Sequence, residues 1–421
     1  MRFGLMYLLQ NPRPWSPDSE ARVYREALEQ IELADELGFD YAWASEHHFL
    51  EEYSISSAPE VFLAAAAART KRIRVAHGIV SLPSGVNHPA RVAERIGALD
   101  IISGGRLDFG TGQGSTQHEL GAFNTDRATK REQWAESIEV ILRMFTEEPF
   151  TGYEGRWGSM PPRNVLPKPI QKPYPPVWIA CSFPDTIEAA ARRGLGALSF
   201  AFSKVEECIE RAETYYRTLE SDDCVPIGPQ VNANFAVAFP FFCHQDQEVA
   251  YERAMGGIEF YIQSFMHYYI QGGHRPGLTD LRRDFSQEPL PEESLARMTD
   301  VARQAVGTPE KLRELVRIHE DAGVDQIIFQ VQLGDNKHEH ICESMRLFAE
   351  TVMPEFAERR DAVDAAKAER LRGPIEKALG RREETAPVDV SNYIIRTDFE
   401  EGAFGDRLDE GAWYADKFDL D

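Results

Sequence analysis

Apolar residues occur along the chain in two alternating patterns, short continuous runs and longer stretches spaced as one face of a helix. The runs predict strands buried on both faces, and the longer stretches predict amphipathic helices that cover them. The predicted strands are residues 2–7, 39–43, 73–82, 106–110, 176–180, 195–202, 235–240 and 325–332. The predicted helices are residues 19–37, 59–69, 90–102, 130–145, 185–193, 205–219 and 339–352. Eight strands, mostly alternating with helices, predict an α/β fold of the (β/α)8 TIM-barrel type rather than an open sheet.

Two segments interrupt this alternation. Residues 151–176 contain seven prolines, which remove backbone donors, so we expect a long surface loop. Residues 243–323 are too long for a simple crossover and must hold extra helices. Aromatic residues at 260–269 there are either helix core or a substrate lid.

The last part of the chain departs from the barrel pattern. We predict two domains, a barrel with insertions at residues 1–355 and a helical, acidic C-terminal extension at residues 356–421. Residues 383–421 are polar and acidic with scattered aromatics. They are either an arm on this barrel or a neighbouring subunit, or a disordered tail.

The composition of the chain limits the kinds of molecule that it can bind. Among 421 residues, 46 Lys and Arg stand against 69 Asp and Glu, for a net charge of −23, which argues against nucleic acid and anionic membranes. Any anionic ligand must therefore be held locally by a few arginines, hydroxyls and amides. No apolar run reaches the length of about 18 residues that spans a membrane, and no signal peptide is visible, so we predict a soluble, cytoplasmic protein. The five cysteines lack CxxC spacing, which predicts reduced thiols.

The stretch from Trp43 to Phe49 holds the main candidates for chemistry. Glu46, His47 and His48 come directly after a predicted strand, at the end where parallel α/β proteins assemble their sites. Neighbouring strand residues point to opposite faces, so one histidine is expected to be catalytic and the other structural. The alternative is that the carboxylate and the imidazoles only satisfy each other at a strand end. No metal site is predicted, because no further His or Cys follows at ligand spacing.

Two segments are candidates for binding an anion. The run Gly110–Gly114 lets a backbone approach a flat or phosphorylated ligand closely, but it lacks the GxGxxG spacing of a dinucleotide fingerprint. Residues Ser182–Thr186 place hydroxyls at a helix start after a strand. The alternative for the second segment is an ordinary helix cap.

Several short motifs, taken together and in order, resemble the bacterial luciferase-like flavin monooxygenases over about residues 1–355. They are Glu46-His47-His48-Phe49, His88-Pro89 with Glu94, Leu99-Asp100, Ser103-Gly104-Gly105-Arg106 and Val306-Gly307-Thr308-Pro309-Glu310. The resemblance implies a barrel that binds reduced FMN at the C-terminal ends of its strands. It further implies that O2 reacts there to give a C4a-(hydro)peroxyflavin, which oxidises an organic substrate. Apolar and aromatic residues in the seventh strand and the following insertion suggest a hydrophobic substrate.

The resemblance also assigns site residues. His47 would act as a general acid/base, oriented by Glu46 or His48. Arg131, Ser182 and Thr186 look like ligands of the flavin phosphate. Gly78-Ile79 falls where the family often has a non-proline cis peptide behind the flavin ring. Gly112-Gln113 stands where luciferase carries a reactive cysteine and an arginine, so we expect a monooxygenase that emits no light.

The sequence also leads to expectations about the partners of the protein and about alternative functions. No dinucleotide fingerprint follows an early strand, so we expect a two-component system in which a separate NAD(P)H-dependent flavin reductase supplies reduced FMN. A homo-oligomer is expected. The first rival is a deazaflavin-dependent oxidoreductase on the same barrel, and the second is a non-catalytic flavin-binding accessory subunit.

Overall fold

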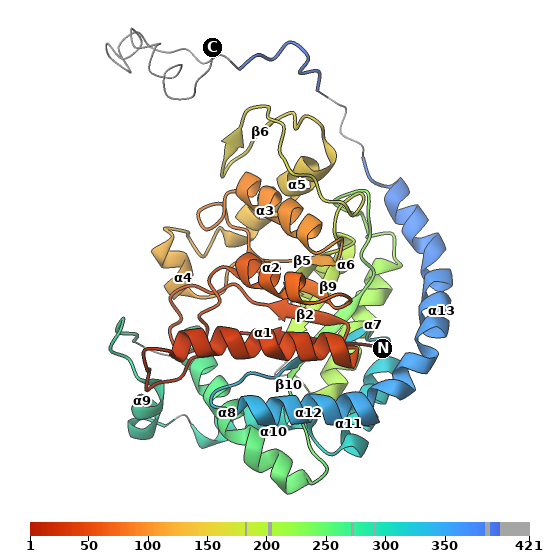
Figure 1. The fold of residues 1–421 in the computed structure, drawn as a ribbon. Coiled ribbons are helices and arrows are strands. Elements are labelled where there is room, and N and C mark those ends of the chain that lie inside the picture. The colour runs from red at the N-terminus through yellow and green to blue at the C-terminus, as the bar shows by residue number, and fades with distance from the viewer. Residues whose placement is uncertain (182, 201–203, 271–272, 290, 384–387, 396–421) are drawn as a thin grey trace, which may run out of the picture. The chain divides into compact units, whose positions relative to one another are not determined.

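Eight parallel strands form a closed barrel (Figure 1). The structure is a computed structural model that describes residues 1–421 except 182, 201–203, 271–272, 290, 384–387 and 396–421. The barrel strands are β1 (Arg2–Tyr7), β2 (Tyr41–Ala44), β3 (Arg74–His77), β5 (Leu107–Gly112), β8 (Val177–Cys181), β9 (Gly196–Phe200), β10 (Phe235–Pro240) and β13 (Gln326–Gln330). Pairing runs β3-β2-β1-β13-β10-β9-β8-β5, and a β3–β5 pairing closes the ring. The predicted (β/α)8 barrel is confirmed.

Helices surround the barrel. Those that follow the barrel strands are α1 (Ser19–Leu37), α2 (Pro59–Arg69), α3 (Pro89–Ile102), α5 (Lys130–Thr146), α6 (Pro184–Arg192), α7 (Val205–Leu219), α11 (Pro309–Asp321) and α12 (His338–Thr351). Helix α1 shows why the sequence forms them, because its buried residues Val23, Ala27, Ile31 and Ala34 recur on one face. It ends at Gly38, whose φ of 89° suits a residue without a Cβ.

The core has an inner and an outer layer. Side chains that point into the barrel form one cluster, which contains Met6, Trp43, Trp178, Leu198 and Ile328. Side chains on the outer face of the strands pack against the helices in a larger cluster. Because both faces of each strand are buried, the strand sequences read as continuous apolar runs rather than alternating ones.

The region after β3 differs from the expectation in two ways. The predicted strand 73–82 is split into β3 and a short β4 (Val80–Ser81), which pairs with β5. The expected cis peptide at Gly78-Ile79 is wrong, since each cis bond of the described chain precedes a proline and this bond is trans. The trans form is the one that non-proline peptide bonds favour, by about 2.5–4 kcal/mol.

The two insertions match their sequence patterns. The proline-rich loop contains only a short hairpin, β6 (Tyr153–Glu154) and β7 (Ser159–Met160). The predicted extra helices between residues 243 and 323 are confirmed. The elements from 242 to 307 are β11 (Phe242–Cys243), α8 (Gln247–Tyr269), α9 (Leu281–Gln287), α10 (Glu292–Ala302), a 3-10 turn (Arg303–Ala305) and β12 (Val306–Gly307). Aromatic residues of α8, including Phe260, Tyr261 and Tyr268, are buried in a second core cluster, as the helix-core interpretation predicts.

Helix α13 (Met353–Gly380) packs along the barrel on the side where the N-terminus lies (Figure 1). Phe356, Leu371 and Ala378 are its deeply buried apolar residues. One compact unit covers residues 1–385, and residues 386–421 form a second unit, of which the structure describes only 388–395. No helix among the described residues is long and apolar enough to cross a membrane.

Candidate active site

The Glu-His-His segment lies just beyond the C-terminal end of β2. The strand ends at Ala44, so Glu46, His47 and His48 are in a loop whose backbone has already turned. The His47 amide donates to the Ser56 carbonyl at 2.9 Å, which fixes this turn. The two histidines therefore escape the strict alternation of strand residues, and each has a different carboxylate partner.

Glu46 fastens the loop to the neighbouring strand. Its Oε1 lies 3.0 Å from His48 Nε2 and accepts a hydrogen bond from Asn87 Nδ2 at 2.8 Å. Its Oε2 accepts one from the Ser81 amide in β4 at 3.0 Å. Glu46 thus has three hydrogen-bonding partners, and its contact with His48 helps to hold the loop in position.

His47 pairs with a residue that sequence reasoning missed. Its Nδ1 lies 3.0 Å from Glu119 Oε1, so the prediction that Glu46 or His48 orients His47 is wrong. Glu119 also accepts the His48 amide at 3.1 Å. The reason is that α4 (Gln117–Ala122) packs over the loop and brings in a side chain 72 positions away. Within the described chain, no hydrogen bond is found for His47 Nε2, which leaves that atom for a ligand.

Glu119 is held as an anion by its own helix start. Thr116 and Glu119 form a capping box, and Oε2 accepts hydrogen bonds from the hydroxyls of Ser115 and Thr116 at 2.8 Å each. Burial raises the pKa of Glu119, but His47 and the hydroxyl donors outweigh it and lower the pKa to about 2. The Thr-x-x-Glu pattern at 116–119 is a capping signal visible in the sequence, and it could have marked this residue.

Aromatic side chains surround the pair. Tyr53 stands edge-on to His47, with ring centres 5.3 Å apart. Its ring centre also lies 6.0 Å from that of Tyr261 and 5.8 Å from that of Tyr269, both on α8. The Tyr269 hydroxyl donates to Ser115 Oγ at 3.2 Å, which links α8 to the Glu119 cluster. His47 thus borders an apolar, ring-rich surface that carries a few hydroxyls.

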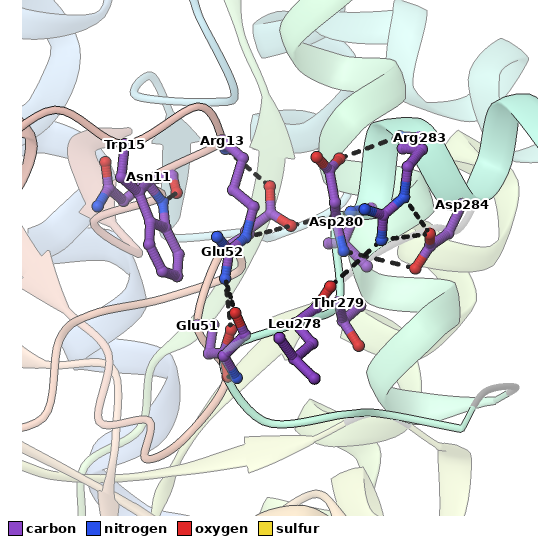
Figure 2. Close-up of polar contacts among 12 residues, drawn as sticks. Asn11, Arg13, Trp15, Glu51, Glu52, Leu278, Thr279, Asp280, Arg283 and Asp284 are labelled. Atoms are coloured by element: carbon purple, nitrogen blue, oxygen red, sulfur yellow. Dashed lines mark hydrogen bonds and ion pairs between the residues drawn. The ribbon is translucent and has the colours of Figure 1, made fainter.

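Two carboxylates pin the segment after α8 to the loop that follows His47 (Figure 2). Glu52 accepts the backbone amides of Arg13 and Leu281 at 2.8 and 2.9 Å. Glu51 pairs with the Arg13 guanidinium at 3.3 Å and accepts the Gly277 amide at 2.7 Å. Three segments that are distant in sequence are therefore fastened beside the site, and none of these residues was predicted.

The phosphate candidates lie at the starts of two helices. Arg131, in the first turn of α5, is exposed and reaches Asp185 of α6 at 3.4 Å. Thr186 lies in the first turn of α6. Its hydroxyl donates a hydrogen bond to the Phe183 carbonyl at 2.6 Å and accepts one from the Phe183 amide at 3.1 Å. Ser182 lies outside the described residues. Arg131 and the residue next to Thr186 thus meet across two separate βα units.

The glycine candidates make close contacts within the barrel. A Cβ at Gly112 would lie 2.3 Å from the Ile79 side chain, and one at Gly78 would lie 2.8 Å from Met6. The close approach at these two positions is to the chain's own side chains. Gln113 follows directly after β5, and Lys130 Nζ donates to the neighbouring Gly114 carbonyl at 2.7 Å.

Two buried polar atoms near the C-terminal end of the barrel have no partner within the described chain. Gln332 Oε1, shortly after β13, and His118 Nδ1, on α4, are buried and have no hydrogen-bond partner in the described part of the chain. Unpaired buried polar atoms of this kind are costly unless a ligand or water completes them. In the same described residues, no group of three or more His, Cys, Asp or Glu is arranged to hold a metal ion. The two unpaired polar atoms at this end of the barrel are the observation that fits an organic cofactor with polar edges.

The chain is therefore a closed (β/α)8 barrel with carboxylate–histidine pairs just beyond the ends of its strands. Proteins with this fold form their active sites at the same, C-terminal face. Residues 1–326 match the family model of luciferase-like monooxygenases. The chain belongs to this family, and the resemblance noted from its motifs is confirmed.

Two of the relatives are named as monooxygenases. The chain is 28% identical over 371 residues to 4-hydroxyprotoasukamycin monooxygenase of Streptomyces nodosus subsp. asukaensis, covering 84% of this chain and 92% of that protein. It is 30% identical over 196 residues to the oxygenase component of the flavin-dependent trigonelline monooxygenase of Acinetobacter baylyi, covering 46% and 52%.

Solved structures share the fold. Monooxygenase RslO1 from Streptomyces bottropensis superposes with a TM-score of 0.69 at 29% identity, covering 85% of this chain and all of that one. An F420-dependent secondary alcohol dehydrogenase superposes with a TM-score of 0.63 at 16% identity, covering 83% and 98%. The second likeness shows the fold alone.

Proposed function

We propose that the protein is an FMN-dependent monooxygenase. It would take reduced FMN from a separate NAD(P)H-dependent flavin reductase and use O2 to oxidise a hydrophobic organic substrate. The observation that carries the proposal is the His47–Glu119 pair, 3.0 Å apart beyond the strand ends of a luciferase-like barrel. The oxygenase component named among its relatives supports the two-component arrangement.

In this proposal His47 moves the proton. Glu119, kept ionised by Ser115 and Thr116, orients the imidazole through Nδ1, which turns Nε2 toward the bound reactants. Imidazole suits the role because both of its protonation states are accessible near neutral pH. Bound reduced FMN would supply the electrons that activate oxygen.

The flavin phosphate would bind between α5 and α6. Arg131 would donate to it in place of Asp185, with Ser182, Thr186 and the α6 amides completing the site. The ring would lie against Gly78, Ile79, Gly112 and Gln113. Matched arginine variants test this assignment. Arg131→Ala is expected to weaken binding of reduced FMN at least tenfold, measured by anaerobic fluorescence titration.

Arg156→Ala is the matched control, because the Arg156 side chain is similarly exposed (70% against 67%) and also forms one surface ion pair. It should bind FMN like the parent. Equal affinity in Arg131→Ala and the parent would remove Arg131 from the site.

The hydrophobic substrate is supported by the rings around His47, among them Tyr53, Tyr261 and Tyr269. A panel of apolar carbonyl and ring compounds, with reduced FMN and oxygen, should reveal product formation coupled to oxygen uptake. Absence of product from every compound, with oxygen uptake no faster than that of free reduced FMN, would favour an accessory flavin-binding role.

Two further measurements separate the rivals. Anaerobic titration should show tighter binding of reduced FMN than of a reduced deazaflavin, whereas the reverse order would indicate a deazaflavin-dependent oxidoreductase. With FMN and NAD(P)H alone, the purified protein should oxidise NAD(P)H slowly, and addition of a flavin reductase should restore turnover. Fast NAD(P)H oxidation without a reductase would contradict the two-component proposal.

A further inference from the structure

A cavity of about 430 Å³ opens at the N-terminal end of the barrel, opposite to the end that carries His47. Strands β1, β2 and β3 begin at Arg2, Tyr41 and Arg74, so these cavity residues mark the strand starts. The lining residues are Arg2, Gly38, Phe39, Asp40, Tyr41, Arg72, Arg74, Arg106 and Arg360. Five arginines thus converge in one cavity of a chain whose net charge is −23.

The topology explains how arginines so far apart in sequence meet. Strands β1, β2, β3 and β5 are consecutive neighbours in the barrel. Arg2 and Arg74 open β1 and β3, Arg72 precedes β3, and Arg106 precedes β5, so parallel pairing brings all four to one rim. Arg360 comes from α13, which lies outside the residues 1–326 that match the family. The complete cluster therefore depends on the C-terminal helix.

Carboxylates neutralise only part of this charge. Arg2 pairs with Asp364 at 2.5 Å, Arg74 with Asp108 at 2.5 Å and Arg360 with Asp40 at 2.8 Å. Arg72 and Arg106 form no ion pair with any described residue. Asp35 adds a further negative charge near Arg72 and Arg106, and its carboxylate accepts hydrogen bonds from the backbone amides of residues 71–73. Among the residues that line the cavity itself, there are five arginines and one carboxylate, Asp40.

The two arginines without an ion pair contribute in different ways. Arg106 uses its guanidinium on backbone carbonyls and Thr70, so it adds charge but few free donors. Arg72 is exposed, and within the described structure its guanidinium donates only through Nη2, to the carbonyls of Asp35 and Glu36. Its Nε and Nη1 remain available to a ligand at the rim.

A second cavity on the same face provides an internal contrast. It measures about 330 Å³ and shares Arg2 and Tyr41 with the first. Its charged lining is balanced, because Lys367 pairs with Asp325 at 2.5 Å and Arg2 with Asp364. The excess of arginine is therefore a property of the first cavity and not of the whole face.

We propose that the arginine-lined cavity binds a small polyanion that carries phosphate or carboxylate groups. The planar guanidinium fork matches the oxygens of both groups, and its charge is retained at any physiological pH. The volume is within the range of small-molecule sites. A free anion is otherwise repelled by this acidic chain, so binding requires a local cluster of this kind.

Calorimetric titration of the full-length protein with pyrophosphate and, separately, with citrate tests the proposal. The parent should bind at least one of them, and pyrophosphate can also occupy the proposed flavin-phosphate site, which Arg131→Ala removes. Arg72→Glu should weaken that binding at least tenfold, because a donor at the rim becomes a repelling charge. The variant should fold, since the Arg72 guanidinium contacts only backbone carbonyls there. Arg72→Gln provides a second variant with the same expected direction.

Two control variants make the result specific. Arg91→Glu changes the net charge by the same amount on an exposed residue of α3, so it should bind the anion like the parent. Arg131→Ala alters the proposed flavin-phosphate site at the other end of the barrel and should also retain binding. Binding of pyrophosphate alone would assign phosphate ligands, and binding of citrate alone would assign carboxylates.

Three results would overturn the proposal. The first is that neither anion binds the parent at millimolar concentration, which would leave the arginines a purely structural role. The second is equal affinity in the parent and both Arg72 variants. The third is loss of binding in Arg131→Ala or Arg91→Glu but not in Arg72→Glu.

Discussion

The two ends of the barrel carry opposite kinds of polar chemistry. At the C-terminal end, Glu119 and Glu46 hold His47 and His48, each at 3.0 Å. At the N-terminal end, arginines dominate and aspartates pair with only some of them. An imidazole can gain or lose a proton near neutral pH, whereas a guanidinium stays charged. The first end therefore suits proton transfer, and the second suits permanent binding of negative charge.

The two ends also differ in whether their polar groups have partners within the chain. At the C-terminal end, where Gln332 follows β13, its buried Oε1 lacks a partner in the described chain. At the other end, α13 closes the barrel through its ion pairs with Arg2, Asp40 and Asp325 and through buried Leu371. Substitution of His47 should therefore mainly reduce the reaction rate, and substitutions under α13 should mainly reduce stability.

The largest effect should come from His47→Ala. General acid/base catalysis typically contributes about 10²–10⁴-fold, so substrate oxidation should fall by that factor while the fold and binding of reduced FMN remain. Steady-state rates with a substrate from the panel, together with circular dichroism, measure this. His340→Ala, on α12, is the control and should keep the parental rate. A folded His47→Ala protein with near-parental turnover would remove His47 from the mechanism.

Leu371→Ala should be the most damaging substitution under α13. The side chain is 1% exposed, and such truncations cost about 2–5 kcal/mol of unfolding free energy. Urea unfolding should show the loss. Val363→Ala on the same helix, at 38% exposure, should stay within about 0.5 kcal/mol. Similar values for both variants would mean that α13 does not stabilise the barrel through its buried face.

Glu119→Gln tests whether the carboxylate stabilises its end of the barrel. The pKa of Glu119 is about 2 in the folded state, below its ordinary value of 4.5, so its contribution is present above pH 4.5 and is lost as pH falls toward 2. The parent should exceed the variant in unfolding free energy at neutral pH by roughly 1.5–3 kcal/mol, the range typical of hydrogen bonds to a charged group. Urea titrations from pH 3 to 7 should show the gap narrowing with acidity. A gap independent of pH would exclude the ionised carboxylate as its cause.

Arg360→Ala should have a smaller effect on stability. The Arg360–Asp40 pair is mostly buried, with side-chain exposures of 24% and 16%, and breaking it should cost roughly 1–3 kcal/mol. Arg91→Ala breaks an exposed pair with Glu94 on α3 and should cost less than about 1 kcal/mol. Thermal or urea unfolding compares them. Equal losses would mean that burial at the N-terminal end does not strengthen its ion pairs.

The sequence by itself determined most of the barrel. Strand β1 at Arg2–Tyr7 and helices α1, α2 and α7 have the predicted bounds, because strands buried on both faces and helices with one apolar stripe leave distinct local patterns. The same patterns placed Glu46, His47 and His48 beyond β2. Proline content also predicted the loop after α5, and the length of the segment after β11 predicted the extra helices.

Only the tertiary structure decided which side chains meet. The partner of His47 is Glu119, and the arginine cavity joins Arg2, Arg72 and Arg360, because loop packing and the position of α13 bring distant residues together. Periodicity predicts which face of an element is buried, but it contains no information about the neighbour across a loop, since that contact depends on the whole packed arrangement.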